Sequence, residues 1–287
     1  MIGRPSPFLT RFAPSPTGYL HRGHGFSALT AFEAARASGG DLILRIEDID
    51  RTRCRAEYEA AAYEDLAWLG LEWVRPVRRQ SEHMADYGAA LRELSERGLT
   101  YRCFRTRREV ASAIESAPHG AMETFRGEAL SPEEEARRLK AGDAYAWRLS
   151  LAAAERALGG FDGLSFVEEG AGPGGEHGLI AVRPQVGGDV VLARKDVGVA
   201  YHLAVTVDDA LQGVTHVIRG HDLFEATHVQ RLLQALLALP APTYRHHRLL
   251  TGPDGKRFAK RDNSQTLREL RASGITAAEL RREMGLD

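Results

Sequence analysis

The stretch that most constrains this chain lies near its start, from Thr10 to Gly25. It opens with a short apolar segment that fits a first β-strand. Pro14 and Pro16 then end that strand, because proline fixes its own φ and cannot donate to a ladder. An alanine-rich run with apolar residues at helical spacing follows, from residue 26 to 37. The order strand, tight loop, helix predicts an α/β fold, and the N–H groups at such a helix start favour phosphate.

Two histidines and a glycine stand at the start of this helix: His21, Gly23 and His24. The motif His-x-Gly-His is weak by itself, since lone histidines are more often surface or packing residues. With its proline-rich lead-in, Arg-Phe-Ala-Pro-Ser-Pro-Thr-Gly-x-Leu-His-x-Gly-His, it covers 14 consecutive positions. That run resembles the signature of glutamyl-tRNA synthetases and their relatives, which are class I aminoacyl-tRNA synthetases.

The bulk numbers exclude some classes of protein. The 287 residues allow one or two domains, and 38 basic against 39 acidic residues argue against a protein that grips nucleic acid with its whole surface. Local basic clusters exist, although a solvated face is the alternative reading for each. Cys54 and Cys103 are too few for a disulfide framework. No long apolar run or secretory signal is visible, so we expect a reduced, cytoplasmic protein without membrane attachment.

A second buried strand is expected from Asp41 to Asp48, with Glu47 near its carboxyl end. Ligands of open α/β sheets bind beyond the carboxyl ends of the strands, so Glu47 is a candidate site residue. We expect Asp48 and Asp50 to cap the next helix. The run Arg-Ile-Glu-Asp-x-Asp-x-Thr-Arg again resembles the synthetases, and the resemblance implies that Glu47 holds the substrate's amino group.

A β-branched strand ending in Arg219 and Gly220 is expected later in the chain, and the same rule directs Arg219 toward the ligand crevice. The patterns Tyr-x-x-Ala-x-x-Val-Asp-Asp and Val-x-Arg-Gly-x-Asp-Leu are close to those of the synthetases. The resemblance implies that Tyr201 and Arg219 line the amino-acid pocket. An ordinary core position is the alternative for Tyr201.

Near the C-terminus, a basic loop lies in register with the second class I signature, Lys-Met-Ser-Lys-Ser. The loop reads Arg-Phe-Ala-Lys-Arg and keeps only the second lysine, Lys260. Arg22, Arg257 and Ala259 depart from common residues of the two signatures. These departures leave open a degenerate paralogue that binds tRNA or glutamate without catalysis.

The resemblance implies ATP and Mg²⁺ as requirements, because forming an aminoacyl adenylate brings two anions together. Positioned cations and donors then supply most of the catalysis. His21, His24 and Lys260 would be catalytic, and the nucleotide would be bound by these three with Gly23 and Arg257. For L-glutamate the expected binding residues are Arg11, Phe12, Ala13, Pro14, Ser15, Glu47, Tyr201 and Arg219.

Residues 101–107 resemble the entry to the family's zinc knuckle, but Arg105 stands where a second cysteine is usual. Residues 117–121 supply neither the tyrosine nor the cysteine of the pattern. Structural zinc needs about four ligands, and Cys103 with His119 is too few, so we expect no zinc.

The expected fold is α/β, with a Rossmann-like parallel sheet of the class I synthetase type, a small inserted α+β module and a short helical C-terminal extension. We expect the first half of the catalytic domain over 1–96, the inserted module over 97–186, the second half over 187–240, and the basic loop with its tail over 241–287. Two short helices are expected in that tail, over 266–272 and 276–284.

Only 26 residues follow Arg261, whereas a complete glutamyl-tRNA synthetase carries a large helical anticodon-binding region there. The chain therefore resembles the short paralogues, the glutamyl-queuosine tRNA(Asp) synthetases. The resemblance implies that it activates glutamate without tRNA and esterifies it onto queuosine at the wobble position of tRNA(Asp). A short synthetase that charges tRNA(Glu) and an inactive paralogue are the alternatives. Nothing demands more than a monomer.

Overall fold

The computed structural model describes residues 8–115, 124–195, 198–250 and 265–286. Within these ranges a parallel sheet organises the molecule. Strand β1 pairs with β2, β2 with β3, and β10 with β11, all in parallel. Their bounds are β1 Leu9–Phe12, β2 Asp41–Ile46, β3 Val74–Arg79, β10 His216–Gly220 and β11 Thr243–His247. These strands form two ladders, β1-β2-β3 and β10-β11, and the N–H of Thr215 donates to the carbonyl of Leu9 at 2.9 Å, which sets β10 beside β1 so that the strands lie in the order β3-β2-β1-β10-β11.

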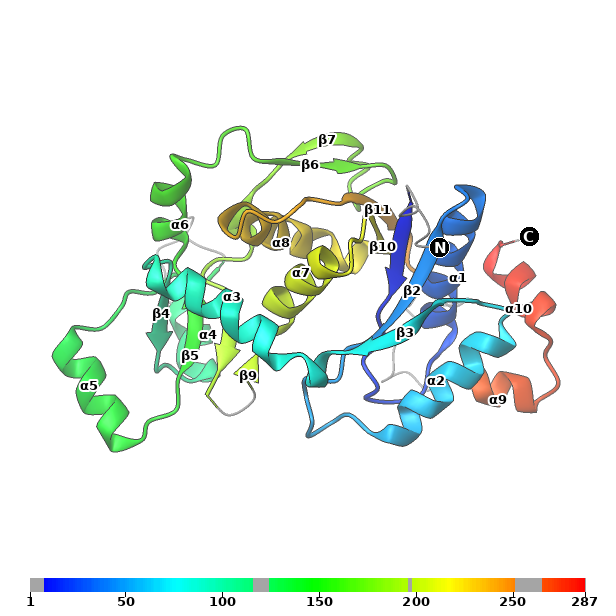
Figure 1. The fold of residues 1–287 in the computed structure, drawn as a ribbon, viewed down its shortest axis with the longest axis horizontal. Helices are drawn as coiled ribbons and strands as arrows, with labels where there is room; N and C mark the ends of the chain where they lie inside the picture. The colour runs from blue at the N-terminus through cyan, green and yellow to red at the C-terminus, as the bar shows by residue number, and fades with distance from the viewer. Residues whose placement is uncertain (1–7, 116–123, 196–197, 251–264, 287) are drawn as a thin grey trace, which may run out of the picture.

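Helices cover both faces of this sheet, as the expected Rossmann-like fold requires. Helix α1 (Arg22–Ala37) packs on β1, β2 and β10 through its apolar side. Helices α7 (Tyr201–Leu211) and α8 (Phe224–Leu236) pack on each other across the sheet from α1 (Figure 1). Helix α2 (Ala56–Trp68) follows β2.

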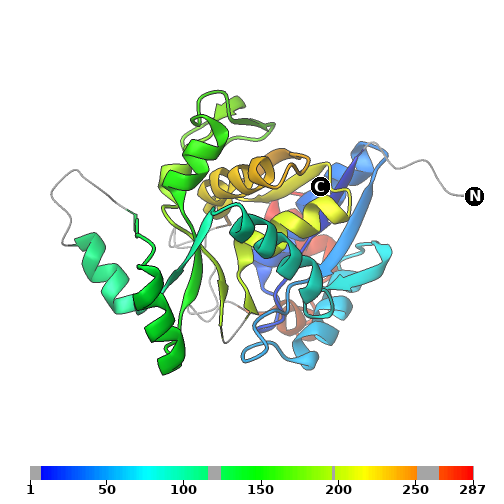
Figure 2. The same ribbon diagram turned by 60° about the vertical axis from the view of Figure 1, so that its left-hand side comes forward.

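A second, antiparallel sheet lies to one side, in the order β4-β5-β8-β9 (Figure 2). Its strands are β4 Thr100–Cys103, β5 Ala146–Leu149, β8 Val191–Arg194 and β9 Gly198–Val199. The expected domain boundaries stay a prediction, but this sheet corrects one part of them. Strands β8 and β9 follow the boundary expected at residue 186, yet β8 pairs with β5 of the middle segment and β9 pairs with β8. The sequence alone favours the catalytic half for the apolar run after residue 189, because an antiparallel strand buried on both faces has the same pattern as a parallel one.

A hairpin from the same middle segment joins the parallel sheet. It consists of β6 (Ser165–Glu168) and β7 (Gly178–Ala181), and it reaches β11 through the pair Tyr244 and Glu168. The expected separate module over 97–186 does not predict this attachment to β11. The middle segment therefore contributes to two sheets.

The remaining helices surround these sheets. They are α3 Met84–Glu96, α4 Arg107–Glu115, α5 Pro132–Ala141, α6 Leu151–Leu158, α9 Leu267–Ala272 and α10 Ala277–Met284, with short 3-10 helices η1 Gln80–Glu82, η2 Pro184–Val186 and η3 His221–Leu223. Helices α9 and α10 confirm the two short tail helices, each begun by a threonine capping box at Thr266 and Thr276. The expected capping of α2 by Asp48 and Asp50 is wrong. The N-cap residue is Arg55, while Asp48 accepts hydrogen bonds from Ser81 and Asp50 from Thr52.

The C-terminal tail packs into the core of the N-terminal half. Leu267 and Leu280 are buried in one cluster with Phe26 and Leu29 of α1. A Cβ added at Gly25 would stand 3.3 Å from the Leu267 side chain, so the glycine lets the tail approach α1 closely. The start of α1 is therefore packed between the parallel sheet and the C-terminal tail.

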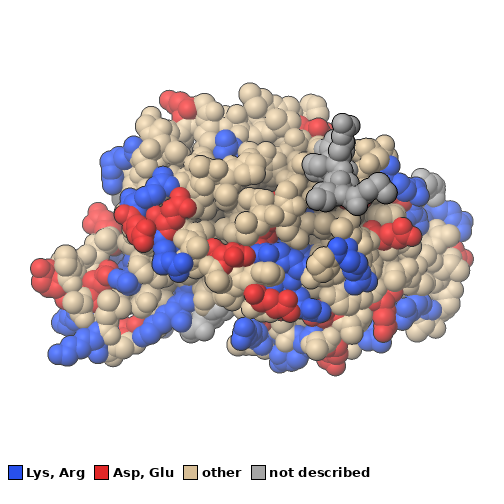
Figure 3. Space-filling model, viewed as in Figure 1, with Lys and Arg blue, Asp and Glu red and all other residues tan. Residues whose placement is uncertain are grey.

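The surface agrees with the nearly balanced charge. Figure 3 shows acidic and basic side chains interspersed over the face it presents. In the described part of the chain, no helix has both the length and the apolar character needed to cross a membrane.

Candidate active site

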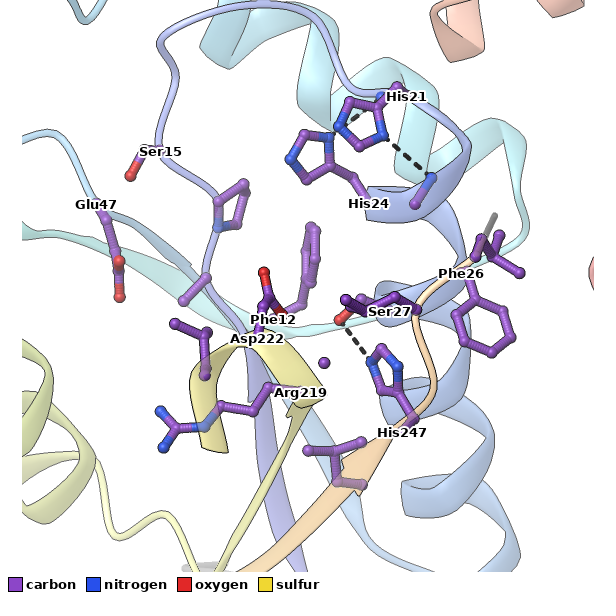
Figure 4. Close-up of a pocket in the computed structure, with 18 of the residues that line it drawn as sticks. Phe12, Ser15, His21, His24, Phe26, Ser27, Glu47, Arg219, Asp222 and His247 are labelled. Atoms are coloured by element: carbon purple, nitrogen blue, oxygen red, sulfur yellow. Dashed lines mark hydrogen bonds between the residues drawn. The ribbon is translucent and has the colours of Figure 1, made fainter. Parts of the chain in front are cut away.

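A cavity of about 380 Å³ opens at the carboxyl ends of β1 and β10, beside the start of α1. Every described residue that the sequence pointed to lines it. These are Arg11, Phe12, Ala13, Pro14, Ser15, His21, Gly23, His24, Glu47, Tyr201 and Arg219. Figure 4 shows two ends of this cavity, with His21, His24, Ser27 and His247 at one and Glu47 and Arg219 at the other.

At the first end, two histidines cap α1. His21 is the N-cap residue, and its Nδ1 accepts from the N–H of Gly23 at 3.1 Å. His24 Nδ1 accepts from the N–H of His21 at 3.2 Å, and the two rings lie 3.8 Å apart. Because both Nδ1 atoms are acceptors, a neutral ring at either position carries its proton on Nε2. Donors of this kind beside a helix N-terminus suit the phosphates of a nucleotide.

Sequence reasoning missed several residues at this end. His247 is the last residue of β11, its Nε2 lies 3.1 Å from Ser27 Oγ, and both residues line the cavity with Asp222. The rule that selected Arg219 applies equally to His247, because it also stands at the carboxyl end of a parallel strand. That signal was available in the sequence.

The predicted residues Arg257, Ala259 and Lys260 lie outside the described residues. The flanks of their segment meet the same end of the cavity. Leu250 lines it, Thr266 forms a bridge with His21, and the N–H of Leu267 donates to the carbonyl of Leu20 at 2.8 Å.

Arg22, one of the departures from the signature, does not line the cavity. It forms an ion pair with Glu283 on α10. This departure ties α1 to the tail and leaves the two flanking histidines in place.

At the other end, two buried arginines share the carboxylate of Asp209. Arg11 Nε lies 3.2 Å and Arg45 Nη2 2.8 Å from Asp209 Oδ1. Burial alone would raise the pKa of Asp209, but these two guanidinium groups hold it below its ordinary value. Its neighbour Asp208 accepts from Arg78, Gln80 and Tyr87. We call Arg11, Arg45, Asp208 and Asp209 the acid-paired centre.

Glu47 borders this centre and faces the cavity. Its Oε1 lies 3.6 Å from Arg45 Nη2. Burial raises the pKa of Glu47 to about 7, although Arg45 and Arg11 act in the opposite direction. A cationic partner would stabilise the ionised form of this buried carboxylate, so the position suits an ammonium group.

Arg219 is held in a different way. Its Nε donates to His246 Nε2 (3.2 Å), its Nη1 to Gln230 Oε1 (2.8 Å) and its Nη2 to Thr227 Oγ1 (2.7 Å). The residue is only 3% exposed, and no carboxylate of the described residues stands within ion-pair distance of it. We call Arg219, Thr227, Gln230 and His246 the Arg219 centre. Tyr201, at the start of α7, lines the cavity beside it.

The expected absence of zinc stays a prediction. Cys103 is buried with Tyr101 and Phe125, and His119 lies outside the described residues. Arg105 and Arg148 lie over the ring of Phe125, with their Cζ atoms 5.8 and 4.5 Å from its centroid. Among the described residues, no three His, Cys, Asp or Glu side chains gather as metal ligands would. These cation–π contacts link Arg105 and Arg148 to the apolar cluster that contains Cys103.

Comparison with known proteins gives a consistent result. The family "tRNA synthetases class I (E and Q), catalytic domain" matches residues 7–285. The chain is 46% identical to a glutamyl-Q tRNA(Asp) synthetase of Rhodobacter capsulatus, over 97% of this chain and 100% of that protein. It is 42% identical to a protein of the same name from Symbiobacterium thermophilum, over 93% and 82%.

Among solved structures, a glutamate tRNA ligase of Elizabethkingia meningosepticum in complex with its amino acid is similar, with a TM-score of 0.72 and 28% identity. That match covers 89% of this chain but 52% of the ligase, so the chain spans about half of the ligase's length.

Proposed function

The chain belongs to the class I tRNA synthetases for glutamate and glutamine, and from that premise we propose that it activates L-glutamate with ATP and transfers it to queuosine at the wobble position of tRNA(Asp). It is an AMP-forming ligase. Its substrates are ATP, L-glutamate and a queuosine-bearing tRNA(Asp), which places it in the cytoplasm with tRNA, and we expect it to work as a monomer.

One observation carries the proposal: the cavity joins a histidine-capped helix start to a buried guanidinium that no described carboxylate neutralises. The first end suits the phosphates of ATP and the second suits a carboxylate. In the first step, the α-carboxylate of glutamate attacks the α-phosphorus of ATP, and pyrophosphate leaves with the electrons of the broken P–O bond.

At the nucleotide end, we assign His21 and His24 to the phosphates, where donation from Nε2 would stabilise charge that develops on the α-phosphate. Gly23 allows the nucleotide to approach the backbone. Lys260 and Arg257 complete this assignment as cations for the β- and γ-phosphates.

At the amino-acid end, we assign the side-chain carboxylate of glutamate to Arg219 and Tyr201. Arg11 attracts the second carboxylate until it reacts, and Glu47 receives the ammonium group. Residues 12–15 form the wall between the two ends. Glutamate then spans the cavity with its α-carboxylate toward the nucleotide.

Magnesium fits this site as a partner of the ATP phosphates. The cavity offers cations and few carboxylates, and Mg²⁺ is often held by phosphates, water and one or two carboxylates. When bound, the ion would neutralise charge on the phosphates and on the departing pyrophosphate.

In the second step, a hydroxyl of the queuosine cyclopentenediol attacks the carbonyl carbon of the adenylate. An ester forms, AMP leaves with the bonding electrons, and the hydroxyl proton is released. Glu47, at the amino-acid end, and Asp222, at the nucleotide end, are the acids among the described residues that line the cavity.

Transfer of radiolabelled glutamate tests the proposal. We expect ATP-dependent label on tRNA(Asp) that carries queuosine, and none on the same tRNA without queuosine or on tRNA(Glu). Label on tRNA(Glu) would favour the acceptor-charging alternative. Absence of both label and glutamate-dependent ATP–pyrophosphate exchange would indicate an inactive paralogue.

A further inference from the structure

The hairpin β6–β7 reaches the amino-acid end of the cavity through one buried chain of hydrogen bonds. Glu168, the last residue of β6, lies 2.5 Å from His246 Nδ1 through its Oε2, and His246 Nε2 accepts from Arg219 Nε at 3.2 Å. The side chains of Glu168 and His246 are both fully buried. The two residues stand 78 positions apart in the sequence.

We propose that Glu168 and His246 are positioning residues that set the orientation of the Arg219 guanidinium, and with it the preference for a substrate carboxylate. This inference rests on the proposed activation of glutamate. Neither residue lines the cavity, so each acts through Arg219.

The hydrogen bonds fix the tautomer of His246. A carboxylate can only accept, so His246 must carry a proton on Nδ1 to bond Glu168. A neutral ring then presents a lone pair at Nε2, which is what the single N–H of Arg219 Nε requires. Burial and the nearby Arg219 lower the pKa of His246, which keeps the ring neutral.

Glu168 is itself held firmly. Its Oε1 accepts from the backbone N–H groups of His246 (2.8 Å) and Gly170 (2.9 Å). A Cβ added at Gly170 would stand 2.4 Å from the carbonyl oxygen of His246, so this turn needs a glycine to wrap the carboxylate. The hairpin is built around the carboxylate of Glu168.

The donor count shows what this arrangement achieves. A guanidinium has five N–H groups, and the Arg219 centre uses three, one on each nitrogen. One N–H remains on each of Nη1 and Nη2, which is the number that a bidentate carboxylate takes. A carboxamide offers one acceptor and one donor, so a fixed fork disfavours glutamine.

The variant Glu168→Gln tests this directly. Gln can keep Oε1 on the two backbone donors, which places its NH₂ group against His246 Nδ1. The imidazole must then move its proton to Nε2, where it meets the N–H of Arg219. We expect the KM for glutamate in pyrophosphate exchange to rise by about tenfold or more, the KM for ATP to change by less than about twofold, and selectivity over glutamine to fall.

A second variant separates positioning from folding. His246→Gln places an amide oxygen near the former Nε2, and because the imidazole is gone, residue 168 can no longer control a tautomer. In that background Glu168→Gln should change the glutamate KM by less than about twofold. A merely structural Glu168 would cost the same in both backgrounds. His246→Asn, which keeps a donor for Glu168 but no acceptor for Arg219, should reproduce the high glutamate KM.

The ring ¹⁵N shifts of His246 provide a readout independent of activity. We expect a proton on Nδ1 in the wild-type protein and on Nε2 in the Glu168→Gln variant. A wild-type proton on Nε2, or an unchanged glutamate KM in Glu168→Gln, would overturn the inference. A wild-type protein that shows Nδ1–H but never activates glutamate would instead overturn the proposed function.

Discussion

The acid-paired centre and the Arg219 centre lie at one end of the same cavity and bury their arginines almost equally, yet they neutralise charge in opposite ways. Arg11 is 5% and Arg219 is 3% exposed. Arg11 and Arg45 contact the carboxylate of Asp209 directly. Among the described residues, the hydrogen-bond acceptors of Arg219 are all neutral, and the nearest acid in its hydrogen-bond chain, Glu168, stands behind His246.

The difference separates arginines that the protein itself already pairs with carboxylates from one whose charge is left for a ligand, although Arg11 also faces the cavity. A buried charge without a partner costs free energy, and direct pairing in the acid-paired centre offsets that cost before any substrate binds. The Arg219 centre leaves part of the cost in place. A ligand carboxylate would offset the remaining cost of burying the Arg219 charge. Binding free energy is therefore concentrated at the buried charge that the free protein does not pair.

Asp209→Asn is expected to have the largest effect. It keeps the size of the side chain but leaves two buried guanidinium groups without their shared carboxylate, which should lower the free energy of unfolding by about 3–5 kcal/mol. Urea unfolding followed by circular dichroism measures this change. Asp50→Asn, at a partly exposed acid that pairs with Arg53, is the control. A loss below about 1 kcal/mol for Asp209→Asn would remove the distinction between the two centres.

Arg219→Met should have the opposite profile, with a small effect on stability and a large effect on glutamate activation. It removes a buried cation that contacts no described carboxylate, so we expect the free energy of unfolding to change by no more than about 1.5 kcal/mol. Glutamate activation should fall by about a hundredfold or more in kcat/KM, because the substrate carboxylate loses its charged donor. Pyrophosphate exchange and urea unfolding give the two values.

Arg231→Met is the matched control for Arg219→Met. Arg231 lies on α8, which packs beside the Arg219 centre, and it donates to the carbonyl of Ser165, but it does not line the cavity. Its loss should leave the glutamate KM unchanged. If Arg219→Met unfolds the protein as readily as Asp209→Asn, the Arg219 centre is structural as well.

Glu47 offers a smaller, pH-dependent contrast, because its pKa is raised to about 7. Below that pH it becomes neutral and loses its attraction for the substrate ammonium, so the KM for glutamate should rise by about tenfold from pH 8 to pH 6. Without substrate the sign is opposite. A carboxyl whose folded pKa is raised stabilises the fold at low pH, and its contribution is lost as the pH rises from 4.5 to 7.

The glutamate KM of the wild-type protein and of Glu47→Gln, measured across this range, checks the assignment. The variant should bind glutamate more weakly and show a flat profile. An equally steep profile in Glu47→Gln would mean that another group titrates.

The sequence predicted the parts of this site that depend on local order. A strand, a proline-rich loop and a helix place His21 and Gly23, and strand ends place Glu47 and Arg219. The family resemblance added roles for these residues. Asp208 and Asp209 were part of a recognised pattern, but nothing local indicated that arginines from β1, β2 and β3 converge on them.

The link through Glu168 could not be predicted either. Its hairpin lies in a glycine-rich segment without clear periodicity, and its pairing with β11 depends on the tertiary fold. Strands β8 and β9 show the same limit, since an apolar run indicates burial but not which sheet will bury it.

The partly exposed pair Arg22–Glu283 serves as a reference for the buried ion pairs of the acid-paired centre. It joins an arginine to a carboxylate as Asp209 does, but its side chains are 21% and 49% exposed. Water and salt screen such a pair, so Arg22→Val should cost less than about 1 kcal/mol in urea unfolding, and high salt should reduce that cost further. A double-mutant cycle with Glu283→Ala isolates the pair from the apolar contacts of α10. A coupling as large as the loss in Asp209→Asn would show that burial is not what separates the acid-paired centre from an ordinary ion pair, and the contrast with Arg219 would then rest on geometry alone.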